Sequence, residues 1–267
     1  MGSSNLINIV LFLYLFSIIL YIASTFKWKR SLDKAVIGAF CVCAVLQSMA
    51  FFQRWIASGH PPLSGMYDSL MLFSLALIVS YLVFTKFYKI NGINILISIL
   101  EVIFISYANM QDKSIMPLVP VLKSNWLVFH VFVYMIGYGL MTVAFFTAIG
   151  YFWCKLIGKE NKLELTDSFN KITYKIVSVG FPMITLGIIT GAVWANRTWG
   201  SYWSWDPKET SALITWLIYA IYLHFTYMKI GKNKINILPI LGFIAIIITF
   251  LFLRYIPAAK DSLHIYQ

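Results

Sequence analysis

Long runs of apolar residues recur along nearly the whole chain and restrict its fold more than any other feature. Each run has about 20 residues, the length that an α-helix needs to cross the hydrocarbon layer of a bilayer. The runs do not alternate between apolar and polar residues, as the strands of a membrane β-barrel do. Lipid offers no hydrogen-bond partners, so a spanning backbone must satisfy its own polar groups, and a helix does this. The sequence therefore predicts an all-α polytopic membrane protein.

The composition supports this fold class. Charged residues make up 12% of the chain and hydrophobic residues 60%, with a mean hydropathy of +0.78. An ordinary soluble domain has about 25% charged residues. A soluble fold of 267 residues could not hide so many apolar side chains without exposing large apolar patches. In a bilayer those side chains can face the lipid.

We expect about eight transmembrane helices within a single membrane domain, residues 1–267. The predicted spans lie near residues 5–26, 35–57, 67–88, 92–109, 126–157, 172–195, 207–228 and 237–256. The fifth is long enough to project beyond the bilayer. The connection between the sixth and seventh spans, residues 194–206, is the richest in candidate functional residues.

The distribution of basic residues predicts the orientation in the membrane. Of the 21 Lys and Arg residues, 14 fall at one set of alternate connections and 7 at the other. Connections rich in Lys and Arg stay in the cytoplasm, so both termini are predicted to lie outside. The net charge of +11 then reflects topology, and no nucleic-acid partner is expected.

Four of the nine tryptophans fall within 12 residues of one predicted outer connection. The cluster consists of Trp194, Trp199, Trp203 and Trp205, together with Tyr202. Aromatic residues also form belts at the membrane surface, but a belt is spread over many helix ends. Large rigid rings concentrated in one loop favour a platform for a flat apolar ligand.

The segment Asp206-Pro207-Lys208-Glu209 has the pattern of a capping box that opens the seventh helix. Asp206 is therefore expected to fix where the loop joins the helix, and a direct contact with the ligand is the alternative. Arg197 and Lys208 are candidates for binding a ligand's carboxylates. The alternative role of these two side chains is to extend towards lipid phosphates.

The segment WGSYWSWDPKET, residues 199–210, resembles the tryptophan-rich WWD signature of haem-handling membrane proteins of cytochrome c maturation. With the following ALITW and YLH, it is similar to the system II haem-attachment subunit, the CcsA or ResC type. Residues 54–70 resemble the first outer loop of that family. Ser211 and Gly65 depart from its usual residues, which leaves details of the loops open. The resemblance covers nearly the whole chain.

The chain has four histidines at different predicted depths. His60 and His130 lie on the outer side, and so does His264 in the C-terminal tail. His224 lies 17 residues beyond Pro207, which places it ~25 Å deeper along the seventh helix. Imidazole is a common axial ligand of haem iron, and buried ionisable groups in membranes are usually functional.

The resemblance implies haem b as the bound cofactor, with His130 and His264 as the two iron ligands of an outer haem. It implies that His224 binds iron in an inner, membrane-buried haem. The alternative for His130 and for His264 is an ordinary histidine at the membrane interface. His60, before two prolines, fits a tight turn better than a ligand. Glu101, inside the fourth predicted helix, could be protonated, paired or part of a polar path.

The resemblance further implies a cytochrome c synthase (haem lyase) subunit that moves haem outward for attachment to the C-x-x-C-H segment of apocytochrome c. Its expected partners are a CcsB/ResB-type membrane subunit, the apocytochrome, a thiol-reducing protein and membrane lipid. The expected cellular location is the bacterial cytoplasmic (inner) membrane, or the thylakoid membrane for a plastid-encoded chain. The alternatives are a haem transporter without a bond-forming role and a diheme membrane electron carrier.

Overall fold

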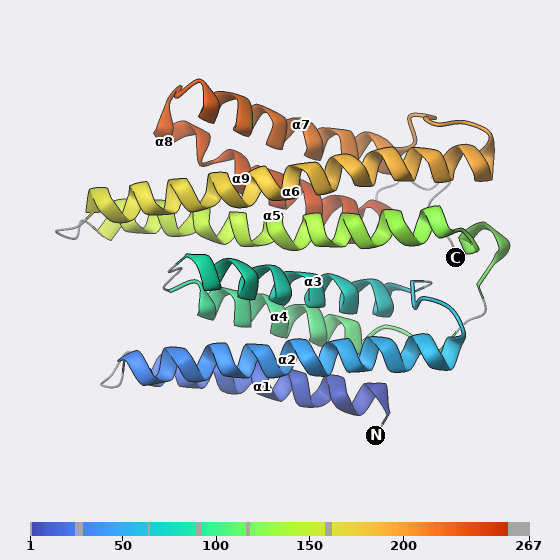
Figure 1. The fold of residues 1–267 in the computed structure, drawn as a ribbon, viewed down its shortest axis with the longest axis horizontal. Helices are drawn as coiled ribbons and strands as arrows, with labels where there is room; N and C mark the ends of the chain where they lie inside the picture. The colour runs from blue at the N-terminus through green and yellow to red at the C-terminus, as the bar shows by residue number, and fades with distance from the viewer. Residues whose placement is uncertain are drawn as a thin grey trace. The chain divides into compact units, whose positions relative to one another are not determined.

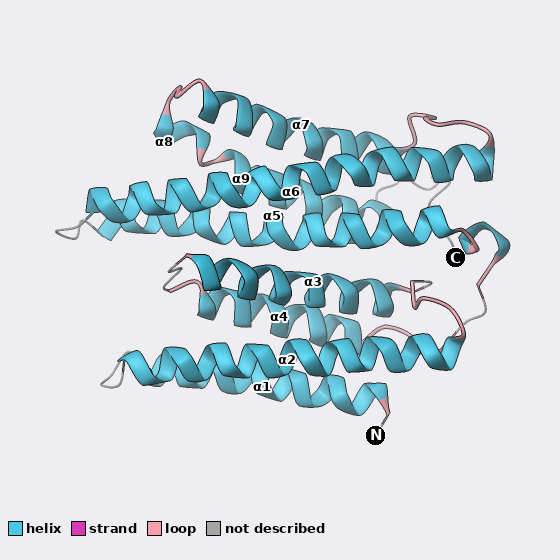
Figure 2. Ribbon diagram, in the orientation of Figure 1, coloured by secondary structure: helices cyan, strands magenta, loops and turns pink. Residues whose placement is uncertain are grey.

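The computed structural model describes residues 2–24, 29–63, 65–88, 92–115, 118–157 and 162–255. In these ranges the chain is helical and contains no strand (Figures 1 and 2). Five helices are long and apolar enough to cross a membrane: Ser3–Ala23, Lys34–Ser58, Met66–Phe87, Asn125–Leu156 and Glu164–Trp199. Shorter apolar helices span Asn94–Asn109 and Leu238–Phe252. The protein is an all-α polytopic membrane protein, as its sequence predicted.

A helix occupies most of each of the eight predicted ranges. The number of spans, the outward termini and the organisation as a single domain stay predictions. Many large apolar side chains point away from the helix contacts, among them Phe12, Ile56 and Trp153, whose exposed fractions are 69%, 82% and 64%. Such an outer surface suits lipid, which solvates apolar groups.

The chain divides into two compact units, Met1–Lys123 and Ser124–Gln267. The first unit contains α1 (Ser3–Ser24), α2 (Lys29–Ser58), α3 (Met66–Phe87) and α4 (Asn94–Asn109). Helix α1 packs on α2 and α4, and α3 packs on the same two helices. The four helices therefore form a closed ring (Figure 1).

The second unit repeats this arrangement with different helices. It contains α5 (Asn125–Ile157), α6 (Lys162–Trp199), α7 (Pro207–Tyr227), the short α8 (Lys232–Ile235) and α9 (Leu238–Ile247). Each long helix packs on the next along the chain, and α9 returns to α5. A π-helical turn, Ile248–Phe252, continues α9. The ring places the start of α5, the end of α6 and the start of α7 at one end of the unit (Figure 1).

The first unit is held together by aromatic contacts and by buried polar groups. The ring of Phe40 lies 5.7 Å from those of both Tyr14 and Tyr81. Near the end of α2, Arg54 Nε lies 2.6 Å from Asp68 Oδ1, and the Arg54 guanidinium lies over the Tyr67 ring at 4.7 Å. A buried ion pair of this kind is costly to break, because the remaining charge would have no partner.

Glycines allow α5 and α6 to pack closely. A Cβ added at Gly137 would come within 2.7 Å of Ile184, and one at Gly187 within 2.2 Å of the Tyr134 ring. A Cβ at Gly191 would come within 2.8 Å of the His130 ring. Gly187 and Gly191 form a G-x-x-x-G pattern, for which the sequence predicts a close helix contact. The structure confirms that contact and shows that aromatic and imidazole rings fill the space.

Candidate functional site

His130 lies near the start of α5, in a recess that the glycines of α6 leave open. Its ring is half-buried, and its Nδ1 lies 2.7 Å from the backbone oxygen of Gly187. The Thr190 hydroxyl donates to the same oxygen at 3.2 Å. The recess exists because neither Gly187 nor Gly191 carries a side chain.

The hydrogen bond to Gly187 determines which ring nitrogen of His130 can bind a metal. A backbone oxygen only accepts hydrogen bonds, so Nδ1 must donate and carry the proton. In the neutral imidazole the lone pair is then at Nε2. Metal-binding histidines usually donate their other ring N–H to a carboxylate or a backbone carbonyl, which fixes the ring and raises its basicity. His130 therefore has the backbone hydrogen bond that commonly orients a metal-binding histidine.

Aromatic side chains of α5 extend from this recess along the helix. The Tyr134 ring lies 5.1 Å from that of His130, and the Tyr138 ring lies 4.9 Å from that of Tyr134. On a helix, Trp126, Tyr134 and Gly137 share the face of His130 at i−4, i+4 and i+7, a spacing that predicts an aromatic wall with a gap. Tyr134 is in the predicted place, whereas Gly137 packs against α6 and offers no gap.

Arg197 joins the end of α6 to the start of α5. Its guanidinium lies over the ring of Trp126 at 5.5 Å, in cation–π geometry, and the side chain is exposed. An exposed, stacked guanidinium can still pair with a carboxylate on a ligand. Arg197 and His130 thus lie at the same end of the second unit.

Helix α6 extends four residues further than the predicted span, which ended at residue 195, and continues to Trp199. It ends where Gly200 adopts a φ of 78° and donates its N–H to Asn196 O at 2.9 Å. Glycine takes this left-handed conformation without a steric penalty, and no helix-breaking residue precedes it. Trp194 and Trp199 are therefore helical, and the loop predicted for 194–206 is confined to 200–206.

The four tryptophans form two pairs instead of one continuous stack. The rings of Trp194 and Trp199 lie 4.8 Å apart at 67°, and Trp194 is buried with 2% exposed. The rings of Trp203 and Trp205 lie 5.7 Å apart at 89°. Both arrangements are edge-to-face, which aromatic pairs favour over a face-to-face sandwich. Such a surface offers edges as well as faces to a flat ligand.

The exposed aromatic residues of the loop are Tyr202 and Trp205, with 60% and 69% of their side chains exposed. Trp205 has a φ of 60°, a conformation that costs a residue with a bulky side chain about 1–3 kcal/mol. The neighbouring backbone is anchored, because Glu209 Oε2 accepts a hydrogen bond from Ser204 N at 2.8 Å. The sequence gives no signal for this strained position.

The predicted capping box at the start of α7 is confirmed. The Asp206 carboxylate accepts a hydrogen bond from Lys208 N at 2.8 Å, and Glu209 accepts one from Asp206 N at 3.2 Å. Asp206 is buried. These bonds fix the junction between the loop and the helix.

Asp206→Asn is expected to be mild, because the amide oxygen of asparagine still caps the helix. Asp206→Ala is expected to destabilise the protein by about 1 kcal/mol and to disturb the loop. Thermal unfolding of the purified chain and its activity in cells measure the two effects. If Asp206→Asn abolished activity in a folded protein, Asp206 would act on the ligand directly.

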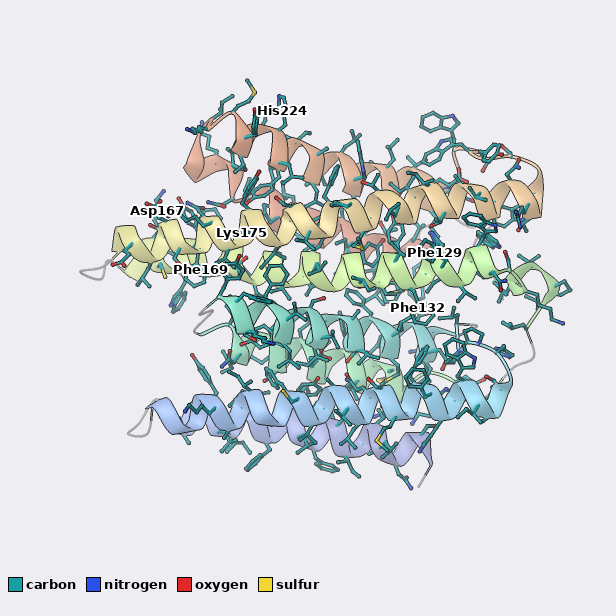
Figure 3. All side chains as sticks on the ribbon, in the orientation of Figure 1. Phe129, Phe132, Asp167, Phe169, Lys175 and His224 are labelled. Atoms are coloured by element: carbon teal, nitrogen blue, oxygen red, sulfur yellow. The ribbon has the colours of Figure 1, made fainter. Side chains whose placement is uncertain are left out.

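His224 lies near the far end of α7 and is exposed. Leu217 and Ile221, two turns and one turn before it, are 44% and 43% exposed, so an apolar strip flanks the imidazole. In Figure 3 His224 and Phe129, the neighbour of His130, lie towards opposite ends of the second unit. This separation agrees with the predicted difference in depth between the two histidines.

Of the two other histidines, the structure describes one. His60 is in the turn after α2 in the first unit, where the Ser58 hydroxyl donates to His60 O at 2.6 Å and the ring Nδ1 lies 3.1 Å from Pro61 O. These local bonds agree with a turn residue. His264 lies outside the residues that the structure describes.

The ion pair of Arg54 and Asp68 was not predicted. Arg54 Nη1 also donates to Lys113 O at 3.0 Å, so one guanidinium ties together α2, α3 and the segment after α4. Opposite charges at the ends of two helices that flank a short loop are the signal that could have indicated it. The pair fixes the connections at that end of the first unit.

Comparison with known proteins identifies the family. Residues 63–259 match the family model described as "Cytochrome C assembly protein". The chain is 34% identical to the protein "Cytochrome c biogenesis protein CcsA" of Trieres chinensis, over 96% of this chain and 95% of that one. It is 36% identical to the protein of the same name in Guillardia theta, over 96% and 94% of the two chains.

A solved structure has the same fold. The chain superimposes on "Cytochrome c Heme Lyase CcmF" with a TM-score of 0.73 and 17% identity, over 94% of this chain. It spans 47% of that larger protein. The sequence matches and the shared fold agree with the resemblance found in the tryptophan-rich segment. The chain belongs to the cytochrome c assembly protein family.

Proposed function

We propose that this chain is the membrane subunit of a cytochrome c synthase, which moves haem outward and presents it for attachment to apocytochrome c. The observation that carries the proposal is the Nδ1 hydrogen bond of His130 to Gly187, at the end of the unit where the tryptophans lie. It orients an imidazole as a metal ligand. The family match supports the same role.

Haem b is the cargo and the substrate in this proposal. His130 and His264 hold the iron at the outer site. The aromatic residues Trp194, Trp199, Tyr202, Trp203 and Trp205 contact the ring, Arg197 binds a propionate carboxylate, and Asp206 fixes the loop. In the attachment reaction, each cysteine S–H of the C-x-x-C-H segment adds across a vinyl C=C of the substrate. The sulfur bonds to one vinyl carbon and the other gains a hydrogen, so no external oxidant or reductant is needed.

The chain's own contribution is to hold and orient the substrate. The fixed His130 ring holds one face of the bound substrate in position, and the anchored loop holds one of its edges. The histidine of the C-x-x-C-H segment would then replace one resident ligand and weaken the hold on the product. An apocytochrome and a thiol-reducing protein, which keeps its cysteines reduced, are therefore proposed partners. The proposed membrane is the bacterial cytoplasmic membrane, or the thylakoid membrane of a plastid.

The test of this function is expression of the chain with its partner subunit in cells that lack their own cytochrome c maturation system. Covalently bound haem survives denaturing electrophoresis and can be stained in a reporter cytochrome. We expect stained cytochrome only with the complete complex. If the complex purified with haem but formed no covalent cytochrome, a delivery protein without a bond-forming role would be the better description.

His224 leads to a further expectation about the partner. In the described part of the second unit its side chain is exposed beside an apolar strip, which suits a helix of another chain. We propose that a CcsB/ResB-type subunit docks there and supplies the second ligand of an inner haem.

In the complex, His224→Ala is expected to remove a low-spin inner haem and to lower the loading of the outer site. Phe225→Leu, one residue away, is the control and should leave both intact. Optical spectra of the purified complexes measure the change. A complete bis-His spectrum from this chain alone, with His130 and His264 replaced by alanine, would show that no partner ligand is required.

A further inference from the structure

The centre of the first unit contains a carboxyl group that the proposed haem chemistry does not use. Glu101 of α4 is fully buried, with 0% of its surface exposed. Its Oε2 accepts a hydrogen bond from the Ser74 hydroxyl of α3. The Ser74 hydroxyl in turn accepts a hydrogen bond from Gln47 Nε2 of α2 at 2.8 Å. Three helices thus meet at one acidic side chain.

Several polar atoms of this cluster have no hydrogen-bond partner among the residues that the structure describes. They are Glu101 Oε1, Gln47 Oε1, Ser98 Oγ and the hydroxyl of Tyr14, all buried. Ser98 lies one turn before Glu101 on the same face of α4. A buried polar atom without a partner costs free energy, and lipid outside the helices cannot supply one. The Gln47 oxygen can only accept, and so can both oxygens of Glu101 while the carboxyl is ionised, whereas the two hydroxyls can donate or accept.

No cation in the described part of the chain neutralises Glu101. The ion pair found there joins Arg54 and Asp68, at a different level of the unit. The titratable groups near Glu101 are the Tyr14 hydroxyl of α1 and the Cys43 thiol of α2, and α3 contributes only the Ser74 hydroxyl. None of these is a cation at neutral pH. An ionised carboxylate would be buried with one hydroxyl donor.

A proton on Glu101 removes the buried charge, which has no cation to balance it. It also adds an O–H donor to a cluster that has unmatched acceptors. A proton also needs no cavity or coordination shell, unlike a metal cation. Ionisable residues inside membrane helices are rare and commonly belong to proton or ion pathways.

A line of buried polar residues connects Glu101 with one end of the unit. Asn94, Ser98 and Glu101 occupy positions i, i+4 and i+7 of α4, with exposed fractions of 5%, 1% and 0%. Asn94 also accepts a hydrogen bond from Tyr81 of α3. The line begins in the first turn of α4, next to the α3–α4 connection, which the Lys and Arg distribution places on the cytoplasmic side. Apolar packing alone does not require polar residues at these three positions.

We propose that Glu101, with Ser74, Gln47 and Ser98, forms a proton-binding site inside the membrane part of the first unit, and that it exchanges protons along the Asn94–Ser98 line of α4. The site is separate from the haem ligands and does not depend on their assignment. In this arrangement Glu101 is a neutral carboxylic acid at neutral pH.

The test is infrared spectroscopy of the full chain in lipid vesicles at neutral pH. A protonated carboxyl has a C=O stretching band that an ionised carboxylate lacks. We expect one such band, lost in Glu101→Gln and retained in the control Glu164→Gln, which changes an exposed residue of α6. Absence of the band, or its survival in Glu101→Gln, would overturn the proposal.

Three further measurements keep the proposal testable if Glu101→Gln does not fold. Ser74→Ala leaves Glu101 in place and removes its hydrogen-bond donor, so the band should shift to higher frequency. A band that disappears when sodium or potassium replaces a large organic cation would indicate a metal site and contradict proton binding.

After transfer to D2O, the band should shift more slowly in Ser98→Ala than in the unchanged chain, and equal rates would rule out the route along α4.

Discussion

Replacement of His130 by alanine is expected to abolish covalent haem attachment while the protein remains folded in the membrane. Loss of the group that accepts a hydrogen bond from a metal-binding histidine typically costs roughly 10–100-fold in affinity or activity, and loss of the histidine itself should cost more. The outer site would retain only His264 as an iron ligand. Haem staining of a reporter cytochrome c and the optical spectrum of the purified complex both measure this effect.

The control for this experiment is His60→Ala, because His60 is also predicted to be on the outer side but lies in a turn with local hydrogen bonds. It should retain most of the attachment activity. Added imidazole should partly restore His130→Ala, since a free ligand can occupy the space of the missing ring. If His130→Ala attached haem as well as His60→Ala did, His130 would not be an iron ligand.

Gly191→Ala is expected to damage the outer site without changing any residue proposed to contact haem. The added Cβ would lie 2.8 Å from both Cε1 and Nδ1 of His130. The imidazole must then move, but its hydrogen bond to Gly187 holds it on that side. Overpacking of this kind costs about 1–3 kcal/mol in stability. We expect a loss of attachment of similar size to that of His130→Ala.

Gly38→Ala is the matched control, since this glycine is also in a helix and a Cβ there meets nothing within 4 Å. Alanine favours a helix over glycine by about 1 kcal/mol, so this variant should be as stable as the unchanged protein or more so. Haem content and thermal unfolding of the two variants separate a displaced ligand from general destabilisation. Unchanged haem binding in Gly191→Ala would contradict the close packing of His130.

The sequence predicted the features that depend on neighbouring residues. Apolar runs gave the helices, because each run carries its own length and periodicity. The capping box at Asp206 was also predicted, since both of its hydrogen bonds join residues within four positions. The G-x-x-x-G pattern indicated that α6 packs closely on another helix.

Features that depend on distant residues could not be obtained in this way. No sequence pattern says that the backbone oxygen of Gly187 accepts from His130, which is 57 positions earlier. The edge-to-face tryptophan pairs follow from where α6 ends, and that end lies beyond the predicted span. Glu101 was noted as unusual, but its contacts with Ser74 and Gln47 require the packing of three helices.

The backbone of Trp205 has a consequence for how the loop could change by mutation. Glycine or asparagine would adopt its φ of 60° more easily than tryptophan does. Selection for stability alone would therefore drive this position towards small residues. A large exposed ring can persist there only if some activity of the protein depends on it. In a copy of the gene that had lost its role, position 205 would be among the first in the loop to drift.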